Sequence, residues 1–217
     1  MKSELFKRIL SSIILLPIVI FIVIKGSFYF NLFLSICFLI TIFEWNKMIT
    51  KKQTNFIGII FITLSFFFTY KIRYSFNEEY SIFLFIIGIC IMTDMGGFIF
   101  GKLIKGPKLI KISPNKTYSG MLGGFLLTLV FIYIFSKYFI HQNSFKITLE
   151  LIFFSIMVSA VSQLGDITIS YFKRVSKIKD TGRIIPGHGG ILDRIDGMIF
   201  AFPFSYSMIQ TNFINIF

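Results

Sequence analysis

Residues 82–93 read IFLFIIGICIMT, a nearly unbroken apolar run that ends directly before Asp94. It belongs to one of seven segments of about 16 to 20 mostly apolar residues, close to the roughly 20 that a helix needs to cross a hydrocarbon core. The segments begin at Leu10, Phe28, Asn55, Tyr80, Met121, Ile147 and Ile195. This pattern predicts an all-α fold, a polytopic integral membrane helical bundle with about seven transmembrane helices.

The composition agrees with a membrane protein. Of the 217 residues 55% are hydrophobic and 15% are charged, against roughly 25% charged in an average soluble domain. Lys7 and Arg8 precede the first apolar run as they would in a signal peptide, but no small-residue cleavage site follows, so we expect a retained first span. Cys37 and Cys90 fall inside apolar segments and indicate neither a disulfide framework nor a zinc site.

The Lys and Arg residues are distributed unequally between the two sides of the membrane. The formal net charge is +12, which by itself would also suit a nucleic-acid-binding protein. With seven spans and the N-terminus inside, 17 of the 22 Lys and Arg residues lie in inside segments. This asymmetry follows the positive-inside rule, so we set the nucleic-acid hypothesis aside and expect the two basic loops on the cytoplasmic face.

The composition shifts near residue 80. Residues 1–79 are predicted to form an N-terminal transmembrane scaffold, in which Glu44 and Trp45 look like an aromatic interface anchor near a span end. Residues 80–217 hold all five aspartates and both long basic loops. We therefore expect this second part to be the catalytic transmembrane region with cytoplasmic loops.

The most charged stretch is 170–196, SYFKRVSKIKDTGRIIPGHGGILDRID. It holds six cations, three carboxylates and a PGHGG turn between apolar segments. Charges at a membrane are costly unless they have partners. Cations, acids and flexible backbone together are suited to phosphate and metal chemistry, so this stretch is the first candidate for a functional site.

Asp193 and Asp196 are three residues apart and share one face if residues from Ile191 onward are helical. Two carboxylates beside a basic loop favour a magnesium site, because hard cations prefer oxygen ligands. The alternative is a local capping arrangement at a helix end. His188, in the PGHGG turn, is either a general base or phosphate donor, or a structural turn residue.

Asp166 ends the apolar segment that begins near Ile147. A helix continuing from it would bring Ser170, Lys173 and Arg174 onto adjoining turns at the membrane interface. The alternative is a helix end with snorkelling cations. Asp94 also lies at a span edge, where a carboxylate is rare; it indicates function, or else an acid that caps the helix end.

Five lysines and no acid occupy the loop 102–120, KLIKGPKLIKISPNKTYSG. Gly106-Pro107 and Ser113-Pro114 break any long helix, so we expect these lysines on turns. The SPNKT run offers hydroxyls, backbone amides and an ammonium group to a phosphate, although the Walker pattern is absent. A loop that only fixes membrane topology is the alternative.

Together these residues resemble the phosphatidate cytidylyltransferase family, also called CDP-diacylglycerol synthases. Every fixed position of the family signature is present: Ser170, Lys173, Arg174, Lys179, Asp180, Gly182, Ile185, Pro186, His188, Gly189, Gly190, Asp193, Arg194 and Asp196. Asp94 with Gly101-Lys102, the SPNKT run, the stretch RILSSIILLP and Glu44-Trp45 resemble further family blocks. Phe98 stands where members usually carry Tyr, Ser119 where Glu or Gln is common, and fewer apolar spans precede residue 80 than in many members.

The resemblance implies that CTP and phosphatidate react to give CDP-diacylglycerol and pyrophosphate at the cytoplasmic face of the inner or plasma membrane. It implies Mg²⁺, a possible second monovalent cation such as K⁺, and a possible homodimer. The implied catalytic residues are Lys173, Arg174, Asp193 and Asp196, with Asp166, Asp193 and Asp196 as metal ligands. The implied substrate-binding residues are Asp94, Ser113, Lys116, Thr117, Ser170, Lys179, Asp180, His188, Gly189, Gly190 and Arg194.

Three other functions are alternatives to this one. A CTP-dependent kinase of a polyprenol-type membrane alcohol needs similar metal and phosphate groups. A CDP-alcohol phosphatidyltransferase is disfavoured because Asp196-Gly197 is not followed by Ala-Arg and spaced aspartates. A transporter would need acids along a path through several spans, whereas here they cluster near one face.

Overall fold

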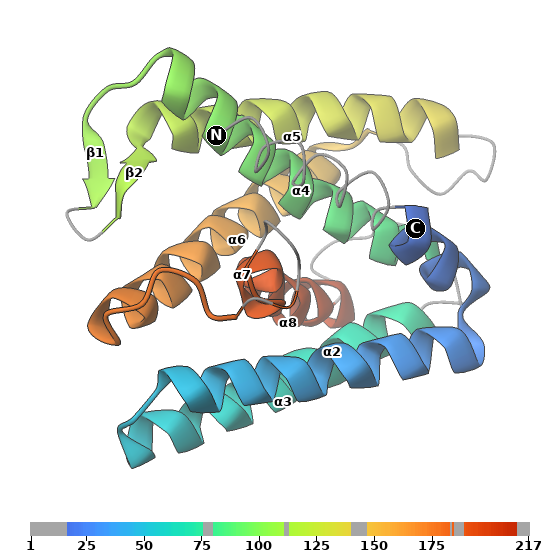
Figure 1. The fold of residues 1–217 in the computed structure, drawn as a ribbon. Coiled ribbons are helices and arrows are strands. Elements are labelled where there is room, and N and C mark those ends of the chain that lie inside the picture. The colour runs from blue at the N-terminus through green and yellow to red at the C-terminus, as the bar shows by residue number, and fades with distance from the viewer. Residues whose placement is uncertain are drawn as a thin grey trace. The chain divides into compact units, whose positions relative to one another are not determined.

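The computed structural model describes residues 17–75, 80–110, 113–139, 147–182, 184 and 189–211, and most of them are helical (Figure 1). The elements are α2 (Ser27–Met48), α3 (Lys52–Ser75), α4 (Tyr80–Leu103), β1 (Lys108–Ile110), β2 (Ser113–Thr117), α5 (Tyr118–Phe139), α6 (Leu149–Val175), α7 (Leu192–Ile195) and α8 (Met198–Gln210). Two compact units divide the chain. Unit 1 is Met1–Leu84 with Phe172–Asp196, and unit 2 is Phe85–Tyr171 with Gly197–Phe217.

Five helices among the described residues, α2 to α6, are long and apolar enough to cross a membrane. They confirm five of the seven predicted spans. The span predicted from Leu10 lies largely outside the described residues, of which 17–25 are helical. The span predicted from Ile195 corresponds to α7 and α8, and the 13 residues of α8 extend about 20 Å, short of a roughly 30 Å hydrocarbon core.

Large apolar side chains are exposed along the spans. Leu39 and Phe43 of α2, for example, are 66% and 64% exposed. A soluble monomer rarely exposes extensive apolar surface, whereas hydrocarbon chains cover such side chains at no cost. The fold is therefore that of a polytopic helical membrane protein, as predicted.

In unit 1, α2 and α3 pack side by side (Figure 1). Trp45 is only 3% exposed; its indole Nε1 donates to the Asn55 carbonyl at 3.2 Å, and its ring lies against Gly58 and edge-on to Phe172. A side chain at position 58 would overlap the indole. The interpretation of Glu44-Trp45 as an interface anchor was wrong, because both side chains are buried inside this unit.

A sharp break at Gly26 separates the helical residues 17–25 from α2. Gly26 has a φ of 61°, and an added Cβ would lie 2.6 Å from the Arg73 guanidinium, so only glycine fits. Arg73 is 5% exposed, and its Nε donates to the Val23 carbonyl at 3.0 Å. The buried guanidinium thereby provides a hydrogen-bond donor for one of the carbonyls that have no partner within the helix where residues 17–25 end.

In unit 2, glycines let α4 and α5 approach closely. A side chain at Gly96 would overlap the backbone of Gly123 and Gly124, and one at Gly120 would lie 2.7 Å from the Gly97 carbonyl. Close packing through small residues is a usual way for membrane helices to associate. Gly96 therefore allows the backbone of α5 to come close to α4.

Buried hydroxyls also join three helices of unit 2. Thr93 Oγ1 of α4 donates to Ser159 Oγ of α6 at 2.7 Å and lies 3.2 Å from Thr128 Oγ1 of α5. All three side chains are at most 1% exposed. Such bonds between membrane helices fix their relative rotation.

The basic loop of unit 2 differs from the prediction. β1 and β2 form an antiparallel hairpin in which Lys108 pairs with Thr117 and Ile110 with Ser113. Lys108 and Lys116 therefore lie on strands rather than on turns. Proline fixes φ in the extended range, and the residue before it avoids the helical region, so Ser113-Pro114 suits a short isolated strand as well as a turn.

Candidate active site

The last turns of α6 carry four of the predicted site residues. Asp166, Ser170, Lys173 and Arg174 all lie within Leu149–Val175, which confirms the predicted continuation of this helix. The carboxylate, hydroxyl and ammonium groups recur at intervals of four and three residues, the spacing of one helix face. The Arg174 guanidinium, which is exposed, donates to the Ile178 carbonyl at 3.5 Å.

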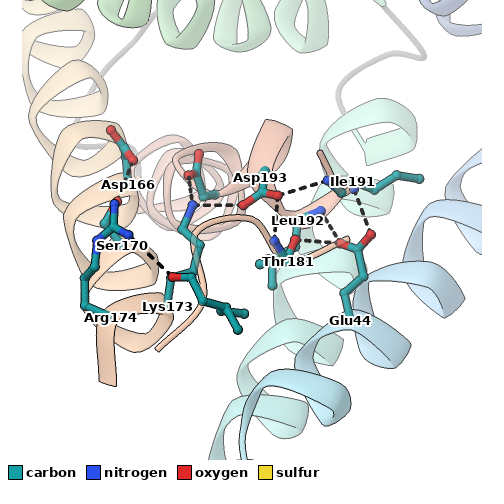
Figure 2. A network of polar contacts seen from close by, with 12 residues as sticks. Glu44, Asp166, Ser170, Lys173, Arg174, Thr181, Ile191, Leu192 and Asp193 are labelled. Carbon is teal, nitrogen blue, oxygen red and sulfur yellow. Dashed lines mark hydrogen bonds and ion pairs between the residues drawn. The ribbon is translucent and has the colours of Figure 1, made fainter. Parts of the chain in front are cut away.

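In unit 1, one lysine faces two carboxylates (Figure 2). Lys173 Nζ lies 2.9 Å from Asp193 Oδ1 and 3.9 Å from Asp196 Oδ2. The three side chains are only 5% to 12% exposed. We call Lys173, Asp193 and Asp196 the Lys173 cluster. Its charges are largely shielded from water, so their mutual attraction is stronger than that of a surface ion pair.

Backbone amides hold Asp193 from the other side. Its Oδ2 accepts from the Thr181 N–H at 2.8 Å and from the Gly190 N–H at 2.9 Å. Burial alone would raise the pKa of Asp193, but the hydrogen bond and charge of Lys173 and the two amides outweigh burial, so the pKa lies below its usual value. The side chain is thus held ionised, with three donors in fixed directions.

A second carboxylate binds the chain at Thr181 and next to Gly190, the two places whose amides hold Asp193. Glu44 of α2 is 1% exposed, and its Oε2 accepts from Thr181 Oγ1 at 3.0 Å and from the Leu192 N–H at 2.8 Å. Its Oε1 accepts from the Ile191 N–H at 3.1 Å. Figure 2 shows this carboxylate directed at the start of α7. Glu44 thus belongs to the polar network of unit 1, a role that was not predicted from the sequence.

A signal for Glu44 was present in the sequence. An ionised carboxylate within an apolar span is costly unless it finds partners, so Glu44 predicts a polar contact. Neither charge pattern nor helical spacing could identify those partners, because they lie 137 to 148 positions further along the chain.

Unit 2 holds a separate cluster around Asp166. Its Oδ2 lies 2.6 Å from Lys116 Nζ of β2, and its Oδ1 accepts from Ser170 Oγ at 3.3 Å. The Asp166 side chain is 35% exposed and that of Lys116 is 21% exposed. The structure therefore joins the SPNKT run to α6, which the sequence had linked only through the family resemblance.

Thr117 and Ser119 have local structural roles at the start of α5. The Gly120 N–H donates to Thr117 Oγ1 at 3.1 Å, which is the geometry of a helix N-cap. Ser119 Oγ lies 2.9 Å from the Thr117 hydroxyl and donates to the Lys105 carbonyl. The serine that departs from the usual family residue thus ties the start of α5 to the turn that follows α4.

Several other predicted residues lie at the surface. Asp94, Lys179, Asp180 and Arg194 have exposed side chains. Gly189 has a φ of 85°, and an added Cβ would lie 2.7 Å from Asp193 Oδ2, so this position favours glycine. His188 and the side chain of Ser113 lie outside the described residues.

The carboxylates are suited to a hard cation. Asp193 and Asp196 direct oxygens at the same ammonium group, and their oxygen donors are those that Mg²⁺ prefers. Mg²⁺ is usually held by one or two carboxylates together with substrate phosphates and water. Although no group of three His, Cys, Asp or Glu side chains gathers among the described residues, this pair fits a magnesium ion that arrives with a nucleotide.

Comparison with known proteins places the chain in a family. The cytidylyltransferase family matches residues 6–78 and 56–212. A phosphatidate cytidylyltransferase of Rickettsia conorii is 35% identical over 207 residues, which cover 91% of this chain and 88% of the relative, and one of Rickettsia bellii is 36% identical over 210 residues, covering 93% and 89%. One of Staphylococcus epidermidis is 38% identical over 157 residues, covering 71% of this chain and 58% of the relative. The chain belongs to the cytidylyltransferase family.

Proposed function

We propose that this protein transfers a cytidylyl group from CTP to phosphatidate and releases pyrophosphate. The family and the names of its relatives support this reaction. The observation that carries it in the structure is the Lys173 cluster, where a shielded ammonium and two carboxylates lie beside a glycine-containing loop. Such a group of charges is suited to phosphates.

The reaction joins two anions. A phosphate oxygen of phosphatidate attacks the α-phosphorus of CTP, and the bond from that phosphorus to the bridging oxygen of the β-phosphate breaks. The attacking oxygen is already anionic, so no general base is needed. The protein has to neutralise charge and align the groups, which is where most catalysis of phosphoryl transfer arises.

We assign that task to the cations on α6. Lys173 and Arg174 stabilise negative charge on the phosphates, and Asp193 orients the Lys173 ammonium through their 2.9 Å contact. Lys116, bound to Asp166 at 2.6 Å, is a second phosphate ligand. Because Asp166 is the more exposed of the acids, an incoming phosphate can compete with it for the lysine.

We propose Asp193 and Asp196 as the carboxylates that hold Mg²⁺ when CTP is bound. That Asp166 is a further metal ligand stays a prediction from the family resemblance. The ion would supply positive charge to the triphosphate and to the leaving pyrophosphate. A second, monovalent cation and a homodimer remain predictions from the family resemblance.

We place the reaction at the cytoplasmic face. The asymmetry of the Lys and Arg residues supports this placement, since loops rich in these residues stay inside. Phosphatidate would keep its acyl chains in the bilayer while its headgroup reaches the α6 cations.

The proposal is tested with detergent-purified protein, α-labelled CTP and phosphatidate, with Mg²⁺ or with a chelator. We expect label in the lipid phase only when phosphatidate and Mg²⁺ are both present. Diacylglycerol, which lacks the phosphate, is the matched control substrate. Absence of lipid label with accessible phosphatidate, or labelling of diacylglycerol, would contradict the proposal.

A further inference from the structure

We propose that Glu44 is a positioning residue for the reaction proposed above, because it binds both ends of the signature loop, residues 181–192, and so fixes the donors that orient Asp193. Glu44 lies on α2, far in sequence from the signature. In the part of the chain that the structure describes, the Glu44 carboxylate binds a hydroxyl and two backbone amides rather than a cation, so it would act on turnover through the loop.

Glu44 accepts three hydrogen bonds from the two ends of this loop. Thr181 Oγ1 is bound at the start of the loop, and the Ile191 and Leu192 N–H groups are bound at its end. Asp193 repeats the pattern, since it accepts from the Thr181 N–H and from the Gly190 N–H. Thr181 therefore donates to both carboxylates, through its hydroxyl group to one and its backbone to the other.

The loop also packs directly onto Glu44. A side chain at Gly182 or Gly190 would overlap Glu44 Oε1, so the backbone lies in contact with the carboxylate on both sides of the loop. Glycine at these positions serves close approach to the acid. The family resemblance implies that Gly190 binds substrate, and in the structure its amide donates to Asp193.

These contacts link Glu44 to the Lys173 cluster. If the loop ends move, the Thr181 and Gly190 amides no longer point at Asp193 Oδ2, and Asp193 no longer orients Lys173. Hydrogen bonds to an ionised acceptor are stronger than those between neutral groups, which favours a carboxylate over an amide at position 44.

The test uses Thr181, because its hydroxyl can be removed with little change of shape. We expect Thr181→Val to lower kcat/KM for CTP about tenfold, the equivalent of one hydrogen bond to a charged acceptor. Thr181→Ser keeps the donor and should restore most of the activity. Thr41→Val is the control: Thr41 is equally buried on α2, one turn before Glu44, and its hydroxyl donates only to the Cys37 carbonyl of the same helix.

Glu44→Gln extends the test. The amide keeps the size of the side chain but brings a donor against the loop donors, so we expect a roughly hundredfold loss of kcat/KM. All activities are referred to folded protein measured by size-exclusion chromatography. Limited trypsin digestion reports local loop order, and cleavage after Lys177, Lys179 and Arg183 should accelerate in both variants but not in Thr41→Val.

A purely structural role predicts a different result. Thr181→Val and Glu44→Gln would then lower the melting temperature and the yield while the activity per folded molecule and the trypsin pattern stay those of wild type. That outcome would overturn the proposal, as would a Thr181→Ser variant as impaired as Thr181→Val. If Glu44→Gln fails to fold, the Thr181 pair still decides the question.

Discussion

Each of the two polar clusters contains a Lys–Asp ion pair, but the two pairs differ in how exposed their side chains are. In unit 1 the Lys173–Asp193 pair is 12% and 5% exposed, and backbone amides bind the acid from the opposite side. In unit 2 the Lys116–Asp166 pair is 21% and 35% exposed, and the Ser170 hydroxyl donates to the acid at 3.3 Å. The first pair is preorganised by the fold, whereas the second can exchange partners.

This difference suggests that the two clusters have different roles in the reaction. A fixed charge costs no reorganisation when negative charge develops in the transition state. A lysine whose carboxylate partner is partly exposed, as Asp166 is, can exchange that partner for an incoming phosphate at lower cost than one whose partner is buried. We therefore assign the transition state mainly to the Lys173 cluster and substrate capture mainly to Lys116.

The largest expected effect is on turnover in the Asp193→Asn variant. The amide would turn a donor toward either the Lys173 ammonium or the loop amides, so we expect at least about a 10²-fold loss of activity while the protein still inserts into the membrane. Glu150→Gln, an exposed acid at the start of α6, is the control. Near-normal activity of Asp193→Asn would show that Asp193 is not needed for the reaction.

The second prediction compares stability in the two clusters. Lys173→Met leaves two poorly solvated carboxylates without their cation, which should lower the free energy of unfolding in detergent by about 3 kcal/mol. Lys116→Met should cost less than about 1 kcal/mol, because the carboxylate that it leaves behind, Asp166, is 35% exposed and can be solvated by water. Equal losses in the two variants would show that burial does not distinguish the pairs.

The third prediction concerns pH. The pKa of Asp193 is lowered in the folded protein, so its contribution to stability is complete above the ordinary carboxyl value of about 3.9 and is lost as the pH falls through the folded value. The difference in melting temperature between wild type and Asp193→Asn should be constant near neutral pH and shrink below about pH 4. A difference that instead grows on acidification would contradict the sign of this linkage.

The smallest expected effect belongs to Ser170. Its 3.3 Å bond to Asp166 is long and partly exposed, so Ser170→Ala should lower activity about twofold. Ser170→Thr, which keeps the hydroxyl, should stay within experimental error of wild type. A loss in Ser170→Ala as large as that in Asp193→Asn would show that this hydroxyl contacts substrate directly.

Much of this molecule was predictable from local patterns. The length of the apolar segments predicted the five spans, and the spacing of Asp166, Ser170 and Lys173 predicted that one helix carries all three. Both predictions depend only on residues that are neighbours in the sequence. The signature also indicated that Lys173, Asp193 and Asp196 act together. Their contacts confirm that these side chains gather, while their roles in catalysis and metal binding remain predictions.

Long-range contacts were not predictable in this way. The role of Glu44 depends on a loop 137 to 148 residues away, and the burial of Trp45 depends on Gly58 and Phe172. The β1–β2 hairpin was missed because glycine and proline indicate only where helices stop. What replaces a helix is decided by pairing between strands, which single-residue preferences do not report.

The most direct test of the central claim follows both ends of CTP in one reaction with wild-type protein and phosphatidate. With CTP labelled differently at the α- and γ-phosphates, we predict that the α label enters the lipid and the γ label leaves in pyrophosphate, one for one. Transfer of the γ label to a lipid, with CDP left in the water, would identify a kinase and contradict the account.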